Sequence, residues 1–174
     1  MRIGVISDTH DNLEMIKRAV DLFNSEGVEL VIHAGDFVSP FTEKPFRALN
    51  AKFVGIFGNN DGDKLLLREK YRGVGELSEE PLVLEMNARK IVVTHKPKIV
   101  EALVASRIYD VVIFGHTHKA EVRKEKEAKG EDSGGKKGKE VLVLNPGECC
   151  GYLTGRKTVA ILDLETLSAR IEEI

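Results

Sequence analysis

Short, continuous apolar runs alternate with segments of helical periodicity through much of the chain, and no other feature limits the fold as strongly. The runs "RIGVIS", "VELVIHAG", "AKFVGIFG" and "YDVVIFG" predict strands that are buried on both faces. Helices are expected between the strands, over residues 13–26, 40–49, 61–70 and 99–106. This βαβα order favours an α/β domain with a largely parallel central sheet.

Other segments predict strands without intervening helices. "PLVLEM" and "RKIVVTH" are expected to pair, and "AEVRKE", "KEVLVLNPG", "KTVAILDLE" and "LSARIEEI" predict antiparallel strands joined by turns. Two sheets packed face to face, with helices outside, would accommodate both patterns. Because no internal repeat and no domain boundary is visible, we expect a single domain over residues 1–174.

Composition argues against several classes of protein. With a formal net charge of −2, the chain has no evident nucleic-acid-binding patch, and no apolar run approaches the ~20 residues of a membrane span. Met1 leads directly into an apolar strand without a signal segment, so we expect a cytoplasmic protein. Cys149 and Cys150 are adjacent, so free thiols are expected rather than a strained disulfide. No partner surface is readable, which leaves homo-oligomer formation open.

One segment of low complexity, Lys124 to Glu140, consists almost only of Lys, Glu and Gly. We expect a mobile, solvated hairpin loop there, between two late strands. Within it, "GEDSGGK" matches the core of a phosphate-binding loop. We reject that match because Lys137 stands where a Ser or Thr should bind magnesium, and no strand and helix flank it.

Polar residues follow five of the predicted strands at the point where each strand ends. A single Asp there is usually a helix cap or turn former, and a single His is usually structural. Seven such residues at five strand ends are not explained that way, because parallel strands bring their carboxyl ends to one edge. They are Asp8, His10, Asp36, Asn59, His95, His116 and His118.

This set has the chemistry of a metal site. Oxygen and imidazole donors without thiolate suit Mn²⁺, Fe²⁺, Co²⁺, Ni²⁺ or Zn²⁺, and we expect Mn²⁺ first. Seven ligands exceed what one ion needs, whereas two ions that share a carboxylate use them all. In "GHTH", residues 115–118, the two imidazoles can then serve different ions. Two such ions would activate a water and neutralise an oxyanion, which is the chemistry of phosphate-ester hydrolysis.

The order and spacing of these residues resemble the five signature blocks of the calcineurin-like metallophosphoesterases. "SDTHDN", "GNNDG", "GHTH" and "NPGECCGYLTG" look like the small bacterial and archaeal phosphodiesterases of the YfcE type. The resemblance implies a four-layer α/β/β/α sandwich and hydrolysis of a small phosphate ester by a metal-bridging hydroxide. It also implies one ion on Asp8, His10, Asp36 and His118, and a second on Asp36, Asn59, His95 and His116, with Asp36 as the bridge.

Two positions depart from the family pattern. Larger relatives carry a His in the third block that assists the leaving group, and here Asn60 takes its place beside Asn59. An amide cannot donate a proton, so aryl and other good leaving groups should be favoured. The next residue, Asp61, is expected to cap the following helix. In the fourth block, "THKP" retains His95 but lacks the second His of many members, which leaves the substrate class open.

From this resemblance we expect the catalytic residues to be Asp36, Asn59, Asn60 and His95. The segment "NPGECCGYLTG" has two readings: its start is only a tight turn, or its backbone packs under the His116–His118 loop. In the second reading, Glu148 could accept an imidazole N–H. We do not expect the two cysteines to bind metal, because oxygen and nitrogen donors already complete the site.

Two functional classes remain open. One is a dinuclear metal phosphodiesterase, and the other is a noncatalytic, metal-binding interaction scaffold like the retromer subunit of this fold. Every ligand position here holds a competent residue, whereas a scaffold is free to lose ligands, so we favour the enzyme. A serine hydrolase is disfavoured because no G-x-S-x-G elbow occurs.

Overall fold

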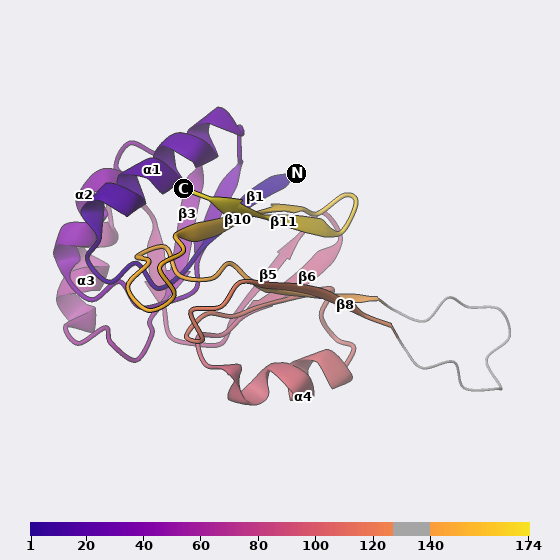
Figure 1. The fold of residues 1–174 in the computed structure, drawn as a ribbon. Helices are drawn as coiled ribbons and strands as arrows, with labels where there is room; N and C mark the ends of the chain where they lie inside the picture. Colours follow the sequence, from indigo (N-terminus) through magenta and orange to yellow (C-terminus); the bar gives the residue numbers. More distant parts are fainter. Residues whose placement is uncertain (127–139) are drawn as a thin grey trace, which may run out of the picture.

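Two β-sheets packed face to face form the centre of the computed structural model, which describes residues 1–126 and 140–174 (Figure 1). The first sheet has six strands in the order β11-β10-β1-β2-β3-β4. Its strands β1 to β4 run parallel, and β10 and β11 are antiparallel additions at one side. They are β1 (Arg2–Ile6), β2 (Leu30–His33), β3 (Lys52–Ile56), β4 (Glu76–Ser78), β10 (Thr158–Asp163) and β11 (Ser168–Glu173).

The second sheet has five strands in the order β5-β6-β7-β9-β8. The three central strands are parallel, and an antiparallel strand closes each edge. Its members are β5 (Leu82–Met86), β6 (Arg89–Val93), β7 (Val111–Ile113), β8 (Glu121–Glu125) and β9 (Val141–Asn145). Both sheets are therefore mixed.

Helices cover the two outer faces. Figure 1 shows α1 (Leu13–Ser25), α2 (Glu43–Phe46) and α3 (Lys64–Tyr71) on the outside of the first sheet, and α4 (Val100–Ala105) on the outside of the second. Two 3₁₀ turns, η1 (Pro40–Thr42) and η2 (Pro97–Ile99), lead into α2 and α4. This arrangement confirms the predicted four-layer fold. Among the described residues, no helix is both long and apolar enough to cross a membrane.

The core follows from the alternation of side chains along each strand. In β1, Ile3 and Val5 point between the two sheets, whereas Ile6 points to the helical layer. Gly4 faces the same helical layer, and the ring of Phe23 from α1 fills its place: a Cβ atom at Gly4 would lie 2.7 Å from Phe23 Cδ1. Burial of one such aromatic side chain stabilises the fold by about 1.5–3 kcal/mol.

Several predicted boundaries were wrong. The expected helix over residues 40–49 is divided into η1 and α2 and ends at Phe46, and β4 was not predicted, because three residues show too little periodicity. The helix expected from Asp61 begins only at Lys64. Its cap is Asp63, whose Oδ1 accepts the backbone N–H of Leu66 at 3.0 Å. The prediction that Asp61 caps this helix was therefore wrong.

The loop predicted from Lys124 to Glu140 begins too early in the sequence. Lys124 and Glu125 belong to β8 and pair with Leu142 and Val141 of β9. Residues 127–139, on which the rest of that prediction falls, lie outside the described residues.

Candidate metal centre

The polar residues expected at the strand ends lie at one edge, where the two sheets meet. In the first sheet, β1, β2 and β3 run parallel, so the loops that follow them lie side by side. Backbone contacts join the loops, because the N–H groups of Asp8 and Thr9 donate to the carbonyls of Gly35 and Asp36 at 3.0 Å. The second sheet joins them through the N–H of His116, which donates to Asp8 Oδ2 at 3.1 Å.

Two groups of side chains at this edge could each hold a metal ion. Asp8, His10 and His118 form one group, and Asp36, His95 and His116 form the other; within each, the candidate ligand atoms lie within 4.8 Å of one another. Asn59 adjoins the second group, with its Oδ1 3.0 Å from His95 Nε2. The structure thus brings together all seven residues that the sequence singled out.

Asp36 lies between the two groups. Its Oδ2 is 3.5 Å from His10 Nε2 and 3.3 Å from His95 Nε2, so a single carboxylate oxygen faces both. Burial opposes ionisation of this carboxyl, but hydrogen bonds from His95 and Asn60 outweigh it and hold the pKa of Asp36 well below its usual range. Asp36 is therefore an anion at neutral pH.

The backbone at the site is strained. Five of the seven residues have left-handed φ angles, between 38° and 65°: Asp8, His10, Asp36, His116 and His118. Such conformations are uncommon outside glycine and cost about 1–3 kcal/mol each unless the surroundings hold them. Concentration of strain in one set of loops is typical of a functional site.

The hydrogen bonds of two imidazoles test whether the donors fit a metal. His95 Nδ1 lies 2.8 Å from the carbonyl oxygen of Ala34, which can only accept, so Nδ1 carries a proton. His95 Nε2 then faces two further acceptors, Asn59 Oδ1 at 3.0 Å and Asp36 Oδ2 at 3.3 Å. Lone pairs that face one another repel unless a cation, a proton or a metal ion, lies between them. This arrangement fits a divalent metal with Nε2 as the ligand atom.

His118 repeats the pattern. Its Nδ1 is 2.8 Å from Glu148 Oε2, and its Nε2 is 3.5 Å from Asp8 Oδ1. Among the described residues, the buried side-chain atoms without a hydrogen-bond partner are Ser7 Oγ, Asp8 Oδ1 and His10 Nε2. Two of these three belong to the first group, and a buried acceptor without a partner costs about 1–3 kcal/mol. A cation at this point would satisfy both atoms.

Asp61 supports the site in a way that the sequence did not reveal. The buried carboxylate accepts three backbone N–H groups: Val38 at 2.7 Å, Gly58 at 2.7 Å and Asp36 at 3.1 Å. It thus ties together the loops after β2 and β3. Val38 is held at φ 84°, a strained value for a β-branched residue. Burial raises the pKa of Asp61, and the three N–H groups act against that shift.

Asn60 contacts the same carboxylate that lies between the two groups. Its backbone N–H donates to Asp36 Oδ1 at 2.8 Å, and its side-chain amide donates to Asp36 Oδ2 at 2.7 Å. The residue at the expected leaving-group position therefore orients Asp36 in this structure.

Glu80 is a second supporting residue that the sequence analysis did not identify. It holds the backbone at His95 by accepting from Thr94 Oγ1 at 2.7 Å and from the backbone N–H of His95.

The segment after β9 contacts the histidine loop through side chains, whereas the second reading of "NPGECCGYLTG" expected its backbone to do so; the turn of the first reading is also present, because the Gly147 N–H donates to Asn145 Oδ1 at 2.9 Å. The side-chain amide of Asn145 donates to the Gly115 carbonyl and to Thr117 Oγ1, both at 3.0 Å. Glu148 is fully buried and, besides His118, accepts from Thr154 Oγ1 at 2.7 Å and from the Leu153 N–H at 3.1 Å. Burial opposes ionisation, but these hydrogen bonds hold the pKa of Glu148 at about 2.

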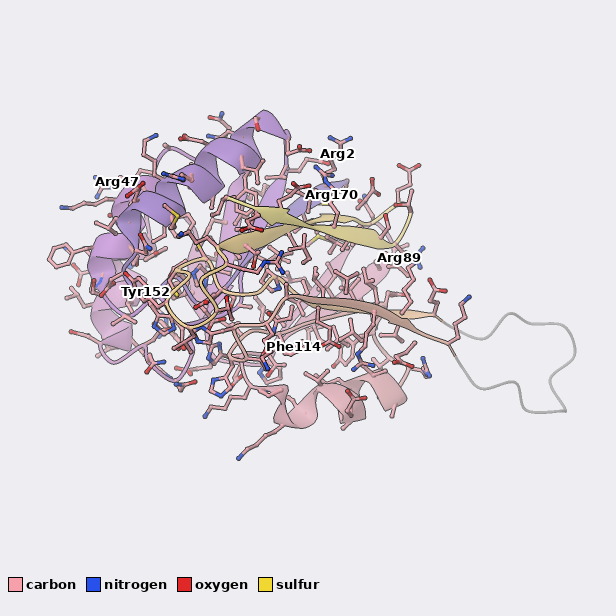
Figure 2. All side chains as sticks on the ribbon, in the orientation of Figure 1. Arg2, Arg47, Arg89, Phe114, Tyr152 and Arg170 are labelled. Atoms are coloured by element: carbon pink, nitrogen blue, oxygen red, sulfur yellow. The ribbon has the colours of Figure 1, made fainter. Side chains whose placement is uncertain are left out.

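The cysteines and the fifth histidine have other environments. Cys149 and Cys150 are free and buried, and burial raises the pKa of Cys150 to about 12. The Cys150 thiol therefore stays protonated and donates to Glu148 Oε2 at 3.2 Å, although a third candidate metal group includes it. Tyr152, labelled in Figure 2, follows on the same loop and is 63% exposed. His33 is buried, and its ring stacks on Phe37 with centroids 3.6 Å apart, so its role is structural.

Comparisons with known proteins agree with this geometry. Residues 1–167 match the calcineurin-like phosphoesterase superfamily domain. A phosphodiesterase of Methanocaldococcus jannaschii is 44% identical over 169 residues, which cover 95% of this chain and 94% of that protein. A solved structure described as a novel archaeal phosphodiesterase is 41% identical, with a TM-score of 0.84 and full coverage of both chains.

A more distant structure shares the fold alone. The phosphoesterase YfcE of E. coli is 18% identical, with a TM-score of 0.64 over 100% of this chain and 98% of that chain. The family match over almost the whole chain and the 44% identity to a full-length relative both lead to one conclusion. The chain belongs to the calcineurin-like phosphoesterase superfamily.

Proposed function

We propose that this protein is a phosphodiesterase with a dinuclear metal centre and that residues 1–174 form one domain with this activity. The observation that carries the proposal is the position of Asp36, whose Oδ2 faces His10 at 3.5 Å and His95 at 3.3 Å. One ion would be held by Asp8, His10, Asp36 and His118. The other would be held by Asp36, Asn59, His95 and His116.

The chemistry of the donors supports this reading. Divalent ions bound here would supply an activated water and a positive field for a phosphate ester. The carboxylates of Asp8 and Asp36 offset only half of the charge of two divalent ions, so the loaded site attracts an anion. The Ala34 carbonyl and Glu148 hold the proton of His95 and His118 on Nδ1, which leaves Nε2 free to bind metal. Oxygen and nitrogen donors make Mn²⁺ the first candidate.

The substrate class follows from the relatives and from Asn60. The Methanocaldococcus jannaschii relative is a phosphodiesterase, which supports a diester substrate here. A positioned general acid typically contributes about 10²–10⁴-fold, and an amide cannot provide it. We therefore expect aryl diesters such as bis-p-nitrophenyl phosphate to be cleaved faster than alkyl diesters.

The metal-binding part is tested by elemental analysis after reconstitution with Mn²⁺. The wild-type protein should hold about two ions per chain, because seven donors exceed the six that one ion takes at most. Asp36→Asn should lower the content of both ions and abolish most turnover. Asp21→Asn, the same change at an exposed position on α1, is the control and should alter neither. One ion per chain in the wild type, or full content in Asp36→Asn, contradicts the shared carboxylate.

The leaving-group part is tested with Asn60→His. A histidine there should raise kcat/KM for alkyl esters more than for aryl esters. Because the change also removes the hydrogen bond from the Asn60 amide to Asp36, metal content is measured on the same samples. Equal wild-type rates across leaving-group pKa, with no differential effect of His, would place the proton donor elsewhere.

The alternative is a noncatalytic scaffold of the same fold. Completeness of the ligand set favours the enzyme, because a scaffold is free to lose ligands and every ligand position here holds a competent residue. Asp61, Glu148 and Glu80 each hold a candidate ligand or its backbone, which a metal site of either kind requires. A protein that binds two metals and hydrolyses no phosphate ester with any of the five candidate ions would favour the scaffold.

A further inference from the structure

A small pocket shares one of its lining residues, His118, with the candidate metal centre. Its volume is about 230 Å³, and it is lined by His118, Lys119, Ala120, Thr154, Arg156 and Thr158. Drug-sized ligands occupy pockets of about 300–1,000 Å³, so this one suits a single substituent rather than a whole substrate. His118 borders both the pocket and the metal centre, which makes the two spaces neighbours.

The charged side chains of the pocket are cations. Lys119 has no carboxylate within 4.0 Å among the residues that the structure describes. Arg156 pairs with Glu173 at 3.4 Å, but their side chains are 66% and 61% exposed. Exposed pairs of this kind contribute little to stability, so the guanidinium can exchange Glu173 for a ligand.

One carboxylate, that of Glu148, lies behind the pocket and offsets part of these charges. Glu148 is fully buried, and its two oxygens accept from His118, Thr154, Leu153 and Cys150. Its lone pairs are therefore already occupied by protein donors. The pocket itself presents an ammonium from Lys119 and a guanidinium from Arg156, which are groups that recognise oxyanions.

The walls of the pocket are held in place from beneath. Glu148 binds both His118 on one side and Thr154 on the other, so one buried group sets the distance between the two walls. Thr158 is buried, and its hydroxyl donates to the Pro146 carbonyl at 2.7 Å. A pocket whose walls are fixed before binding loses less entropy when a ligand enters.

We propose that this pocket is an anion subsite that binds a second phosphate group of the substrate while the scissile diester lies at the metal centre. The proposal rests on the proposed function and narrows it to small diesters that carry an additional phosphate. Lys119 and Arg156 would contact that phosphate. His118 would separate it from the reacting group.

The test compares two substrates with the same leaving group. Thymidine 5′-(p-nitrophenyl phosphate) has only the scissile diester, and its 3′-phosphorylated form adds one phosphate. One exposed ion pair contributes at most about fivefold, so two cations together contribute at most about 25-fold, and we expect kcat/KM to favour the 3′-phosphorylated ester by about tenfold. The preference should fall to about one in the Lys119→Met/Arg156→Met double variant.

A matched control removes the same charge elsewhere. Lys17 and Arg18 lie on the exposed side of α1 and pair with Asp21 and Glu14. The Lys17→Met/Arg18→Met variant should keep the wild-type preference, which separates local contacts from a change in net charge. A preference that survives loss of Lys119 and Arg156, or that falls equally in both double variants, overturns the subsite.

A binding measurement separates failure of the subsite from failure of the proposed function. Calorimetry with the Mn²⁺-loaded protein compares thymidine 3′,5′-bisphosphate with thymidine 5′-phosphate. The wild type and the Lys17→Met/Arg18→Met control should bind the bisphosphate about tenfold more tightly than the monophosphate. The Lys119→Met/Arg156→Met variant should bind both nucleotides with the same affinity. If neither ester is hydrolysed but this pattern holds, the activity is wrong and the subsite stands. Equal affinity of both nucleotides for the wild type overturns the subsite.

Discussion

Replacement of Asp61 by Asn tests whether this carboxylate holds the metal site together. The change preserves size and shape but turns one acceptor oxygen into a donor. In the structure, Oδ1 accepts from Val38 at 2.7 Å, and Oδ2 accepts from Gly58 at 2.7 Å and Asp36 at 3.1 Å. The single oxygen of an amide can accept hydrogen bonds on only one of these two sides. On the other side, the NH₂ group then faces an N–H donor.

The expected loss of stability is taken from the amide orientation that gives up fewer hydrogen bonds. If the amide oxygen stays on Gly58 and Asp36, only the bond to Val38 is lost, and a hydrogen bond to a charged group contributes about 1.5–3 kcal/mol. That bond also restrains the strained backbone of Val38 at φ 84°. We expect the free energy of unfolding to fall by about 2–3 kcal/mol. For a chain of this size, that corresponds to about 5–10 °C in Tm.

The assay is thermal unfolding of the metal-free protein, followed by calorimetric titration with Mn²⁺. Because Asp61 orients the backbone of Asp36, metal affinity should fall along with stability. Asp63→Asn is the control two residues away, since Asn caps a helix as well as Asp and the N-cap bond to Leu66 survives. If Asp61→Asn melts within about 1 °C of Asp63→Asn and binds Mn²⁺ equally well, the proposed support by Asp61 is refuted.

Three further outcomes are expected. Glu148→Gln should weaken Mn²⁺ binding about 10–100-fold in calorimetry, because an amide no longer holds His118 Nδ1–H as firmly; unchanged affinity would contradict this. Gly58→Ala should lower the free energy of unfolding, measured by urea denaturation, by about 1–3 kcal/mol, because its Cβ would lie 2.2 Å from Asp36 Oδ1. Wild-type stability would mean that the loop shifts to accommodate the methyl group without cost. In the folded protein at pH 8, Cys149 and Cys150 should resist a thiol reagent and react only after unfolding, because burial raises the pKa of both; rapid labelling of the native state would show that the segment opens.

Much of the fold and the set of candidate ligands could be predicted from the sequence, because both depend on local pattern. A run such as "RIGVI" has too few polar residues for an exposed strand, so it must be covered on both faces. Parallel strands place their carboxyl ends together, so the residues after them could be grouped before any coordinates were known. His33, the last residue of β2, does not belong to that group, and its ring packs on Phe37 in the core.

The supporting contacts depended on tertiary structure. Asp61 and Asp63 are both suitable helix caps by sequence, but three backbone N–H groups from loops up to 25 residues away converge on Asp61, and Asp63 takes the cap. Glu148 reaches His118 across 30 residues in the same way. Sequence pattern encodes which residues turn inward. Which N–H lies within about 3 Å of a given carboxylate is decided only when the loops pack, because a hydrogen bond fails over shifts that leave hydrophobic burial unchanged.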